Sequence, residues 1–252
     1  MSAHEVSAHA SMQRDDDDEP LRAILFDVDD TLVDFGASAV AGVADLLGTM
    51  VVDTQLQVGL PHAWHELTEF HYPRFLSGEL NFLDMQLARL AALLGWAGLP
   101  VPHREALIAL EHRRQQVMTL HYQLFPDVLP ALELARAAGY AIGVVSNSDG
   151  NHQRAKLFSV GLADAFSAAI ISGDLGISKP DPRIFLAACE ALGFAPSQVA
   201  YVGDKLDIDA LGAQSAGLTG IWLDRRGSAN TAGPLEGVTV ITTLAELANL
   251  YP

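Results

Sequence analysis

The chain has 252 residues, half of them hydrophobic, which is enough for one large or two unequal folded domains. A formal net charge of -16 argues against nucleic acid and anionic membrane surfaces as partners, because both require basic patches. The single cysteine, Cys189, excludes an intramolecular disulfide framework, and without a bilayer-length apolar run or a secretory signal we expect a cytoplasmic protein.

The first 20 residues are polar and end in a run of four aspartates, a glutamate and Pro20. Like-charge blocks of this kind are typical of disordered tails. We therefore expect residues 1–20 to be a disordered acidic tail, and the folded part to begin near Leu21.

The apolar run Ala23–Phe26 predicts a strand buried on both faces, and Asp27, Asp29 and Asp30 follow it directly. Ionised carboxylates along a buried strand carry a large desolvation cost, so we place them at the strand end, where parallel sheets bind ligands. In extended backbone Asp27 and Asp29 point the same way, and two carboxylates about 4 Å apart repel by roughly 4 kcal/mol at an effective dielectric near 20. A cation would relieve that repulsion, which predicts a metal site with an aspartate available as nucleophile.

Residues 36–121 have a different pattern, with helical periodicity over Leu80–Leu94 and Glu105–Leu120 and Gly and Pro residues between them. Strand-like runs are scarce in this stretch. It is predicted to be an all-helical insertion between two parts of one core, residues 21–35 and 122–252.

After Pro126, strand-like and helix-like stretches alternate. Helices are expected at Pro130–Ala138, Asn151–Phe158, Asp181–Leu192 and Asp207–Ala216, and strands at Tyr140–Val145, Ala168–Ser172, Val199–Val202, Thr219–Leu223 and Val238–Ile241. Repeated units of this length predict an α/β fold with a doubly wound parallel sheet.

Polar residues follow several of these strands and should meet at one edge of the sheet. Ser146 and Asn147 follow one strand, Asp204 follows another, and Lys179 stands between them before Pro180. A hydroxyl, an amide and an ammonium beside carboxylates suit the oxygens of a phosphoryl group. The carboxylates favour a hard cation such as Mg²⁺.

In this order and on these elements, the motifs strongly resemble those of the haloacid dehalogenase superfamily of phosphohydrolases. The resemblance covers nearly the whole chain from Leu21 onward. Its four motifs match Asp27-Val28-Asp29-Asp30-Thr31, then Ser146, then Lys179, then Gly203-Asp204 with Asp209. The helical insertion is similar to the mobile cap of one large subfamily.

The resemblance implies a role for each matched residue. Asp27 would attack phosphorus and form an aspartyl-phosphate, while Asp29 would protonate the leaving oxygen and then activate water. Mg²⁺ would be held by the Asp27 carboxylate, the Asp29 backbone carbonyl and Asp204. Asp209 would support the metal through water or hydrogen bonds. The expected substrate-binding residues are Thr31, Ser146, Asn147 and Lys179.

Several of these residues have a structural alternative. Ser146 could cap a turn, Lys179 could be a surface lysine, and Asp209 could be a first-turn acid favoured by the helix dipole. Asp30 and Asp207 are interpreted as turn or cap residues. Lys205 is expected to face solvent.

The expected function is hydrolysis of a small phosphorylated metabolite by a magnesium-dependent phosphomonoesterase, as a monomer or homodimer. Asp29 argues against a dehalogenase, because a departing halide needs no proton. The absence of lysine between Gly36 and His121 argues against phosphonate hydrolysis through a Schiff base. A sugar phosphomutase, a non-enzymatic binding protein on the same fold and a phospho-accepting receiver stay open as alternatives.

Substrate identity is expected to depend on the helical insertion. Its polar candidates are His62, His65, His71, Arg74, Arg104, Arg113 and Arg114, and its apolar ones are Trp64, Phe70, Tyr72, Phe75 and Phe82. Arg113 and Arg114 fall on adjacent faces of one helix, so at most one of them should reach the site.

Overall fold

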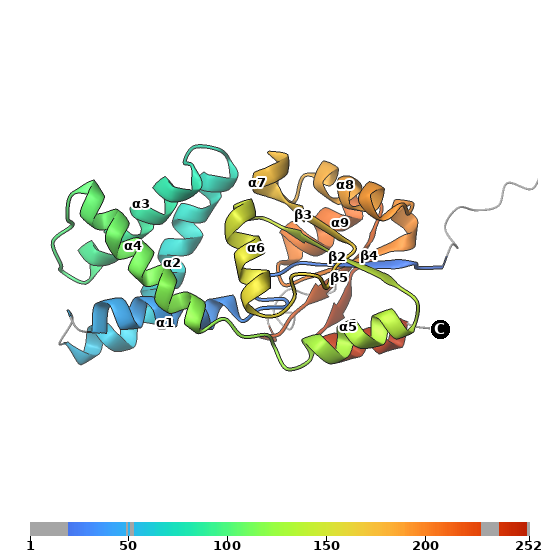
Figure 1. Ribbon diagram of the computed structural model, residues 1–252, viewed down its shortest axis with the longest axis horizontal. Coiled ribbons are helices and arrows are strands. Elements are labelled where there is room, and N and C mark those ends of the chain that lie inside the picture. Colours follow the sequence, from blue (N-terminus) through green and yellow to red (C-terminus); the bar gives the residue numbers. More distant parts are fainter. Residues whose placement is uncertain (1–19, 49, 51–52, 228–236, 251–252) are drawn as a thin grey trace, which may run out of the picture.

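The computed structural model describes residues 20–48, 50, 53–227 and 237–250, so the predicted acidic tail lies, except for Pro20, outside the described residues. A parallel sheet flanked by helices forms one half of the molecule, and four further helices form the other half (Figure 1). This architecture confirms the predicted α/β fold class.

All neighbouring strands of the six-stranded sheet are parallel, in the order β3-β2-β1-β4-β5-β6. The strands are β1 (Ala23–Phe26), β2 (Ala141–Ser146), β3 (Ala168–Ile171), β4 (Val199–Gly203), β5 (Thr219–Leu223) and β6 (Thr239–Ile241). The first strand, β1, is therefore central, and its end lies between the ends of β2 and β4. This order brings the first, second and fourth sequence motifs to one edge.

Side chains of β1 alternate between two cores, one on each face of the sheet. Ile24 and Phe26 pack on the face covered by α5 (Val128–Ala137) and η4 (Leu244–Leu250). Ala23 and Leu25 pack on the opposite face, against α8 (Pro182–Leu192). Burial on both faces explains why this strand is continuously apolar until Asp27.

The four helices between β1 and β2, here called the four-helix segment, are α1 (Phe35–Gly48), α2 (Thr54–Leu76), α3 (Phe82–Trp96) and α4 (Arg104–Leu120). They share a separate apolar core that includes Val43, Leu60, Leu90 and Leu93. Helices α1 and α4 pack closely at Gly42, where a Cβ atom would lie 2.9 Å from the Arg114 carbonyl oxygen. Among the described residues, no helix combines the length and apolar character that a bilayer crossing needs.

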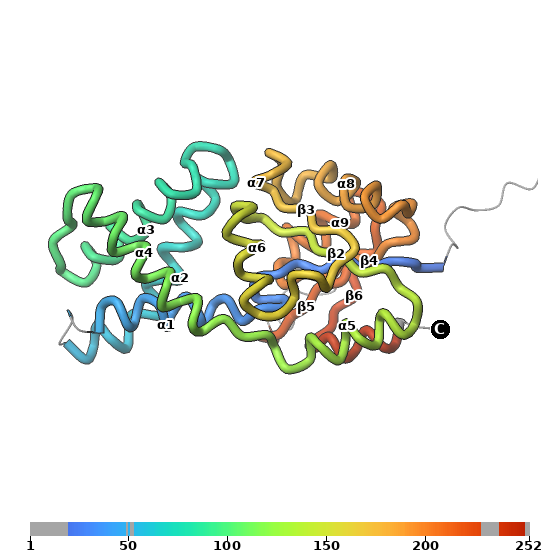
Figure 2. Tube along the Cα trace, viewed as in Figure 1, coloured from blue at the N-terminus to red at the C-terminus, as the bar shows by residue number. Residues whose placement is uncertain are grey.

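The chain enters and leaves the four-helix segment at neighbouring points (Figure 2). Val33 and Leu124 form an antiparallel bridge, and the Asp34 amide donates to the Gln123 carbonyl oxygen at 2.9 Å. The Ser38 hydroxyl donates to the His121 carbonyl oxygen at 2.8 Å. These bonds tie the two connections together beside the end of β1.

Two predicted elements differ in detail. The helix expected over Asp207–Ala216 is a π-helical turn, η3 (Leu206–Ala210), followed by α9 (Leu211–Ser215). The strand expected to reach Ser172 ends at Ile171, and Ser172–Leu175 forms the short helix α7. The remaining helices of the described core are α6 (Gly150–Ser159) and η2 (Pro196–Gln198). Both differences lie near the polar edge of the sheet, where side chains bind backbone groups.

Candidate active site

A cavity of about 380 Å³ lies between the polar edge of the sheet and the four-helix segment. Such a volume is in the usual range for small-molecule sites. Its wall on the sheet side, here called the sheet wall, contains Asp27, Asp29, Ser146, Asn147, Lys179, Asp204 and Asp209. The opposite side, here called the helical wall, contains Trp64, Thr68, Tyr72, Arg89 and Arg114. Seven of the eight sequence-predicted site residues therefore line one cavity.

Lys179 is buried at the centre of the sheet wall. Its Nζ atom donates to Asp27 Oδ1 at 2.6 Å, to Asp209 Oδ1 at 2.7 Å and to the Tyr201 hydroxyl at 2.8 Å. Burial by itself would lower the pKa of Lys179, but Asp209 and Asp27 offset it and raise that pKa. The lysine is therefore a fixed cation inside the site and not a surface residue.

Asp209 reaches this cluster because η3 folds back under the end of β4. Its Oδ2 atom accepts from the Lys205 amide at 3.0 Å, while Oδ1 binds Lys179. A Cβ atom on Gly203 would lie 2.3 Å from Asp209 Cγ, so only glycine permits this approach. Both oxygens are occupied, which makes Asp209 a residue that orients Lys179.

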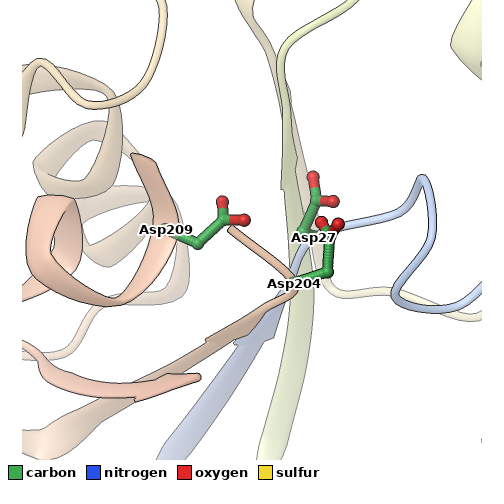
Figure 3. A group of neighbouring side chains, drawn as sticks. All are labelled: Asp27, Asp204 and Asp209. Carbon is green, nitrogen blue, oxygen red and sulfur yellow. The ribbon is translucent and has the colours of Figure 1, made fainter. Parts of the chain in front are cut away.

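Asp204 stands beside Asp27 with its carboxylate pointing the same way, as Figure 3 shows. One carboxylate oxygen from each of Asp27, Asp204 and Asp209 lies within 4.8 Å of the others. Burial raises the pKa of Asp204 above its usual range, and the charges of Asp27 and Asp209 raise it further. Among the described residues no ion pair to Asp204 is formed, so this group fits a divalent cation held mainly by Asp27 and Asp204.

Burial also raises the pKa of Asp27, against the opposing effect of Lys179. The Oδ2 atom of Asp27 has no hydrogen-bond partner in the described part of the chain, whereas Oδ1 binds Lys179. One oxygen is thus held and the other is available to react or to bind a cation.

Asp29 lies apart from the carboxylate group. The backbone turns after Asp29, where Asp30 adopts a φ of 60° and accepts from the Gly36 amide at 2.8 Å. Asp27 and Asp29 both line the cavity, but Asp29 is not part of the group formed by Asp27, Asp204 and Asp209. The Asp29 carboxylate instead pairs with Lys156 of α6, a buried lysine that the sequence analysis did not assign.

Lys156 is held by more than its ion pair. Its Nζ atom donates to Gln153 Oε1 at 3.0 Å and lies 4.1 Å from the centroid of the Phe35 ring. The scarcity of lysine in the chain was the one sequence signal for this residue, because its position in a helix gave no other. Lys156 fixes the direction of the Asp29 carboxylate.

Asn147 and Ser146 end β2 at the cavity. The side chain of Asn147 accepts from the Lys179 amide at 2.7 Å and donates to the Lys179 carbonyl oxygen at 2.9 Å. Both functions of this amide hold the lysine loop, so Asn147 acts as a positioning residue. Ser146 is buried and lines the cavity directly.

The structure separates Thr31 from the cavity. It is fully buried, and its carbonyl oxygen accepts from Arg225 at 2.9 Å. Its hydroxyl has no hydrogen-bond partner among the described residues. Nothing in this arrangement supports contact between Thr31 and a substrate.

Most of the candidate residues of the helical insertion also lie elsewhere. Arg74, Arg104 and Arg113 form ion pairs with Glu79, Asp84 and Asp45. The cavity is lined by His65, Trp64, Tyr72, Phe82 and Arg114 of that set. The expectation that at most one of Arg113 and Arg114 reaches the site is confirmed, and Arg114 is that residue.

The helical wall contains a charged cluster around Trp64. Arg114 binds Glu111 through two hydrogen bonds, of 2.8 Å from Nε and 2.6 Å from Nη2, and both side chains are buried. The guanidinium carbons of Arg89 and Arg114 lie 4.1 and 5.0 Å from the centroid of the Trp64 ring. Arg89 was not among the candidates from sequence, because an arginine inside an apolar helical pattern carries no motif.

Comparison with known proteins agrees with this geometry. Residues 21–217 match the family model described as haloacid dehalogenase-like hydrolase. A glyceraldehyde 3-phosphate phosphatase from Methanopyrus kandleri is 30% identical over 206 residues, which are 81% of this chain and 84% of that protein. A phosphoserine phosphatase from Thermus thermophilus is 39% identical over 150 residues, but the match spans only 59% of that protein and 54% of this chain.

Solved structures share the whole architecture. The HAD-hydrolase YfnB from Bacillus subtilis superimposes with a TM-score of 0.76 and 22% identity, covering 92% of this chain and 99% of that one. Relatives and solved structures named as 2-haloacid dehalogenases also match. From the family model and the Methanopyrus relative we conclude that this chain belongs to the haloacid dehalogenase-like hydrolases.

Proposed function

We propose that this protein is a divalent-cation-dependent phosphomonoesterase that works through an aspartyl-phosphate on Asp27. The observation that carries the proposal is the pairing of two aspartates with two buried lysines. Asp27 is bound to Lys179 and faces the cavity with its second oxygen, while Asp29 is bound to Lys156 two residues later. One carboxylate is thus placed to attack and the other to transfer protons.

In the first step, the free oxygen of Asp27 attacks phosphorus and the bond from phosphorus to the ester oxygen breaks. The leaving oxygen takes a proton from Asp29. In the second step, Asp29 takes a proton from water as that water attacks phosphorus. The bond to Asp27 breaks, and inorganic phosphate leaves.

Lys179 and the Ser146 hydroxyl are suited to bind the phosphoryl oxygens in both steps. We propose Mg²⁺ as the cation, held by Asp27 and Asp204, because carboxylate oxygens without a cation partner select a hard ion. When bound, it would offset negative charge on the transferring phosphoryl group. Asp209 holds Lys179 in position by accepting a hydrogen bond from its Nζ atom.

Asp29 also favours a phosphatase over a dehalogenase. Halide leaves without a proton, so an acid positioned beside the nucleophile has no task in that reaction. Here a buried lysine is devoted to holding this acid. Relatives named for both activities match the chain, and this pair of residues is the feature that favours phosphate ester hydrolysis.

We further propose that residues 36–121 act as a cap over a core of residues 21–35 and 122–252. The support is that every residue with a proposed role in bond breaking lies on the sheet side. Tyr72 of α2 contacts the core directly, through a hydrogen bond from its hydroxyl to the Asn147 carbonyl oxygen. The helical wall would then select substrates without taking part in the chemistry.

The direct test is release of phosphate from p-nitrophenyl phosphate by the purified protein with Mg²⁺. We expect turnover that is saturable in both substrate and metal ion. An Asp27→Asn variant purified in parallel controls for a contaminating phosphatase. Wild-type protein without activity on this ester and on a panel of small phosphomonoesters would contradict the proposal.

A further inference from the structure

Among the residues that the structure describes, the helical wall contains one buried cation with no carboxylate partner. Arg89 of α3 is 6% exposed and lines the cavity. Its Nη1 atom donates to the Thr68 hydroxyl at 3.3 Å, and its Nε atom has no partner among the described residues. Arginine is rarely buried unless a carboxylate pairs with it.

The neighbours of Arg89 do not supply the missing charge. Glu111 is engaged by both Nε and Nη2 of Arg114, and it also accepts from Gln115 at 3.0 Å. That pair is neutral as a unit, so the wall retains one net positive charge at Arg89. Burial and the charge of Arg114 lower the pKa of Arg89 to about 9, against the opposing charge of Glu111.

We propose that Arg89 binds the carboxylate of a substrate that is both a phosphomonoester and a carboxylic acid. The inference rests on the proposed phosphatase activity and adds the substrate class to it. In this arrangement the phosphoryl group lies at the sheet wall and the carboxylate at the helical wall. Phosphorylated hydroxy acids and amino acids of three or four carbons have this form.

The geometry of the guanidinium favours a carboxylate. Nη1 contacts Thr68 and Nε is buried, whereas Nη2 forms no hydrogen bond in the described part of the chain and is the donor left for a ligand. A charge-assisted hydrogen bond from this donor suits a carboxylate oxygen. The ring of Trp64, 4.1 Å from the guanidinium carbon, holds the plane of the fork in position.

The charge balance favours a carboxylate over a second phosphate. A single uncompensated positive charge neutralises one carboxylate, whereas a phosphate carries about -1.5 to -2 at neutral pH. Arg114 cannot supply the second charge while it is bound to Glu111. A bisphosphate would therefore bring an unmatched charge into a buried wall.

Tyr72 shows that the two walls lie within reach of one small molecule. Burial and the charges of Asp29 and Asp27 raise the pKa of its buried hydroxyl well above the usual value, while the charge of Arg89 on the other side acts to lower it. Its ring lines the same cavity as these three residues. A short substrate can span this distance without leaving the cavity.

The test compares two substrates that differ in one group. Glycerol 3-phosphate and 3-phosphoglycerate have the same carbon skeleton and ester, but only the second ends in a carboxylate. The quantity measured is the ratio of their kcat/KM values, which cancels changes common to both. For the wild-type enzyme with Mg²⁺ we expect the ratio to favour 3-phosphoglycerate by on the order of 10- to 100-fold, typical of a hydrogen-bonded charge pair.

Two variants assign this preference to Arg89. Arg89→Met keeps the length of the side chain without charge and should reduce the ratio to near one. Arg89→Lys keeps the charge without the fork and should retain an intermediate preference. Arg113→Met is the matched control, because Arg113 lies on the exposed surface of α4 with its nearest carboxylate, Asp45, 3.9 Å away, and it should leave the ratio unchanged.

A thermal melt of Arg89→Met separates binding from a structural role. Removal of a buried charge that has no partner should leave the melting temperature unchanged or raise it. A marked decrease would show that Arg89 stabilises the fold and would overturn the proposal.

Equal activity of the wild type on both substrates, or a preference for propane-1,3-diol bisphosphate over 3-phosphoglycerate, would overturn the proposal while leaving the phosphatase function intact. Absence of activity on every phosphomonoester would remove both.

Discussion

The two walls of the cavity carry opposite unbalanced charges. On the sheet wall, Lys179 binds both Asp27 and Asp209, while Asp204 forms no ion pair among the described residues, which leaves an excess of negative charge. On the helical wall, Arg89 and Arg114 face a single carboxylate, Glu111, which leaves an excess of positive charge. The sheet wall therefore lacks a cation, and the helical wall lacks an anion.

This difference shows how one cavity can divide its tasks. In the function proposed above, excess carboxylate would recruit a cation and, through it, the phosphoryl group where bonds break. Excess guanidinium would recruit the part of the substrate that does not react. Buried charge without a partner destabilises a protein, so its presence on both walls indicates that the ligand completes the site.

The largest expected effect comes from the nucleophile on the sheet wall. Asp27→Asn keeps the shape of the side chain but removes the attacking oxygen, so kcat should decrease by at least about 10⁴-fold. The measurement is phosphate release from p-nitrophenyl phosphate, with circular dichroism to verify folding. A folded variant with activity near that of the wild type would show that another group attacks phosphorus.

Removal of divalent cations should abolish activity almost as completely. Chelation leaves Asp27 and Asp204 as adjacent carboxylates that repel each other and the incoming phosphoryl group. Activity should return in proportion to added Mg²⁺ and should not return with Na⁺ at equal ionic strength. Undiminished turnover after exhaustive chelation would contradict the assignment of the sheet wall as a cation site.

Asp29→Asn should have a smaller and more specific effect. The variant loses proton transfer, which is typically worth about 10²–10⁴ in rate. Because p-nitrophenolate leaves with little protonation, the second step should be affected most, and phosphorylated Asp27 should accumulate. A mass increase on the peptide that contains Asp27 would report this. Phosphate on a different peptide would instead identify another nucleophile.

Glu111→Gln tests the helical wall through stability. Loss of this carboxylate leaves Arg89 and Arg114 as two buried cations beside Trp64, which should cost about 3–5 kcal/mol of unfolding free energy. The measurement is urea unfolding, and added phosphate or sulfate should recover part of the loss by binding between the two guanidinium groups. Glu105→Gln, at an exposed position of the same helix, serves as the control.

The smallest effect is expected for the ion pair that joins the two halves of the molecule at the surface. Lys205 Nζ lies 3.7 Å from Glu69 of α2, and both side chains are about half exposed, at 43% and 54%. Lys205→Met should change the unfolding free energy by less than about 1 kcal/mol. A larger loss would mean that contact between the two halves depends on surface charge more than on the buried walls.

The comparison of the walls also explains what could be predicted from sequence. Residues of the sheet wall stand directly after strands, and the parallel fold brings strand ends together. Asp27, Ser146 and Asp204 could therefore be placed at one edge from the pattern of strands alone. The predicted order of strands and helices gave the fold class for the same reason.

No comparable rule predicts which residues of the helical segment lie together. Arg89 belongs to α3, and Glu111 and Arg114 belong to α4. The relative rotation of these two helices depends on how they pack in three dimensions. The same holds for Lys156, which reaches Asp29 from the middle of α6. Helical periodicity indicates which face is apolar, but a charged residue on that face gives no sign of its partner.

For Asp29, the sequence could place the residue at the site but could not indicate its partner, Lys156. The left-handed conformation of Asp30 turns the chain directly after these acids. Thr31 was assigned to the substrate from the resemblance of its motif to a known family, and it is fully buried and outside the cavity lining. A motif specifies residue types, but it does not specify which side chains the local backbone turns toward the cavity.

The paired connections at Val33 and Leu124 have a consequence for engineering. Because the chain leaves the sheet and returns to it through adjacent, hydrogen-bonded segments, a block from residue 35 to residue 121 has both ends at one place. Exchange of that block for the equivalent block of another enzyme would leave every strand pairing of the sheet untouched. Substrate specificity could then be changed by exchanging one contiguous segment, without changing the residues proposed to break the phosphate ester bond.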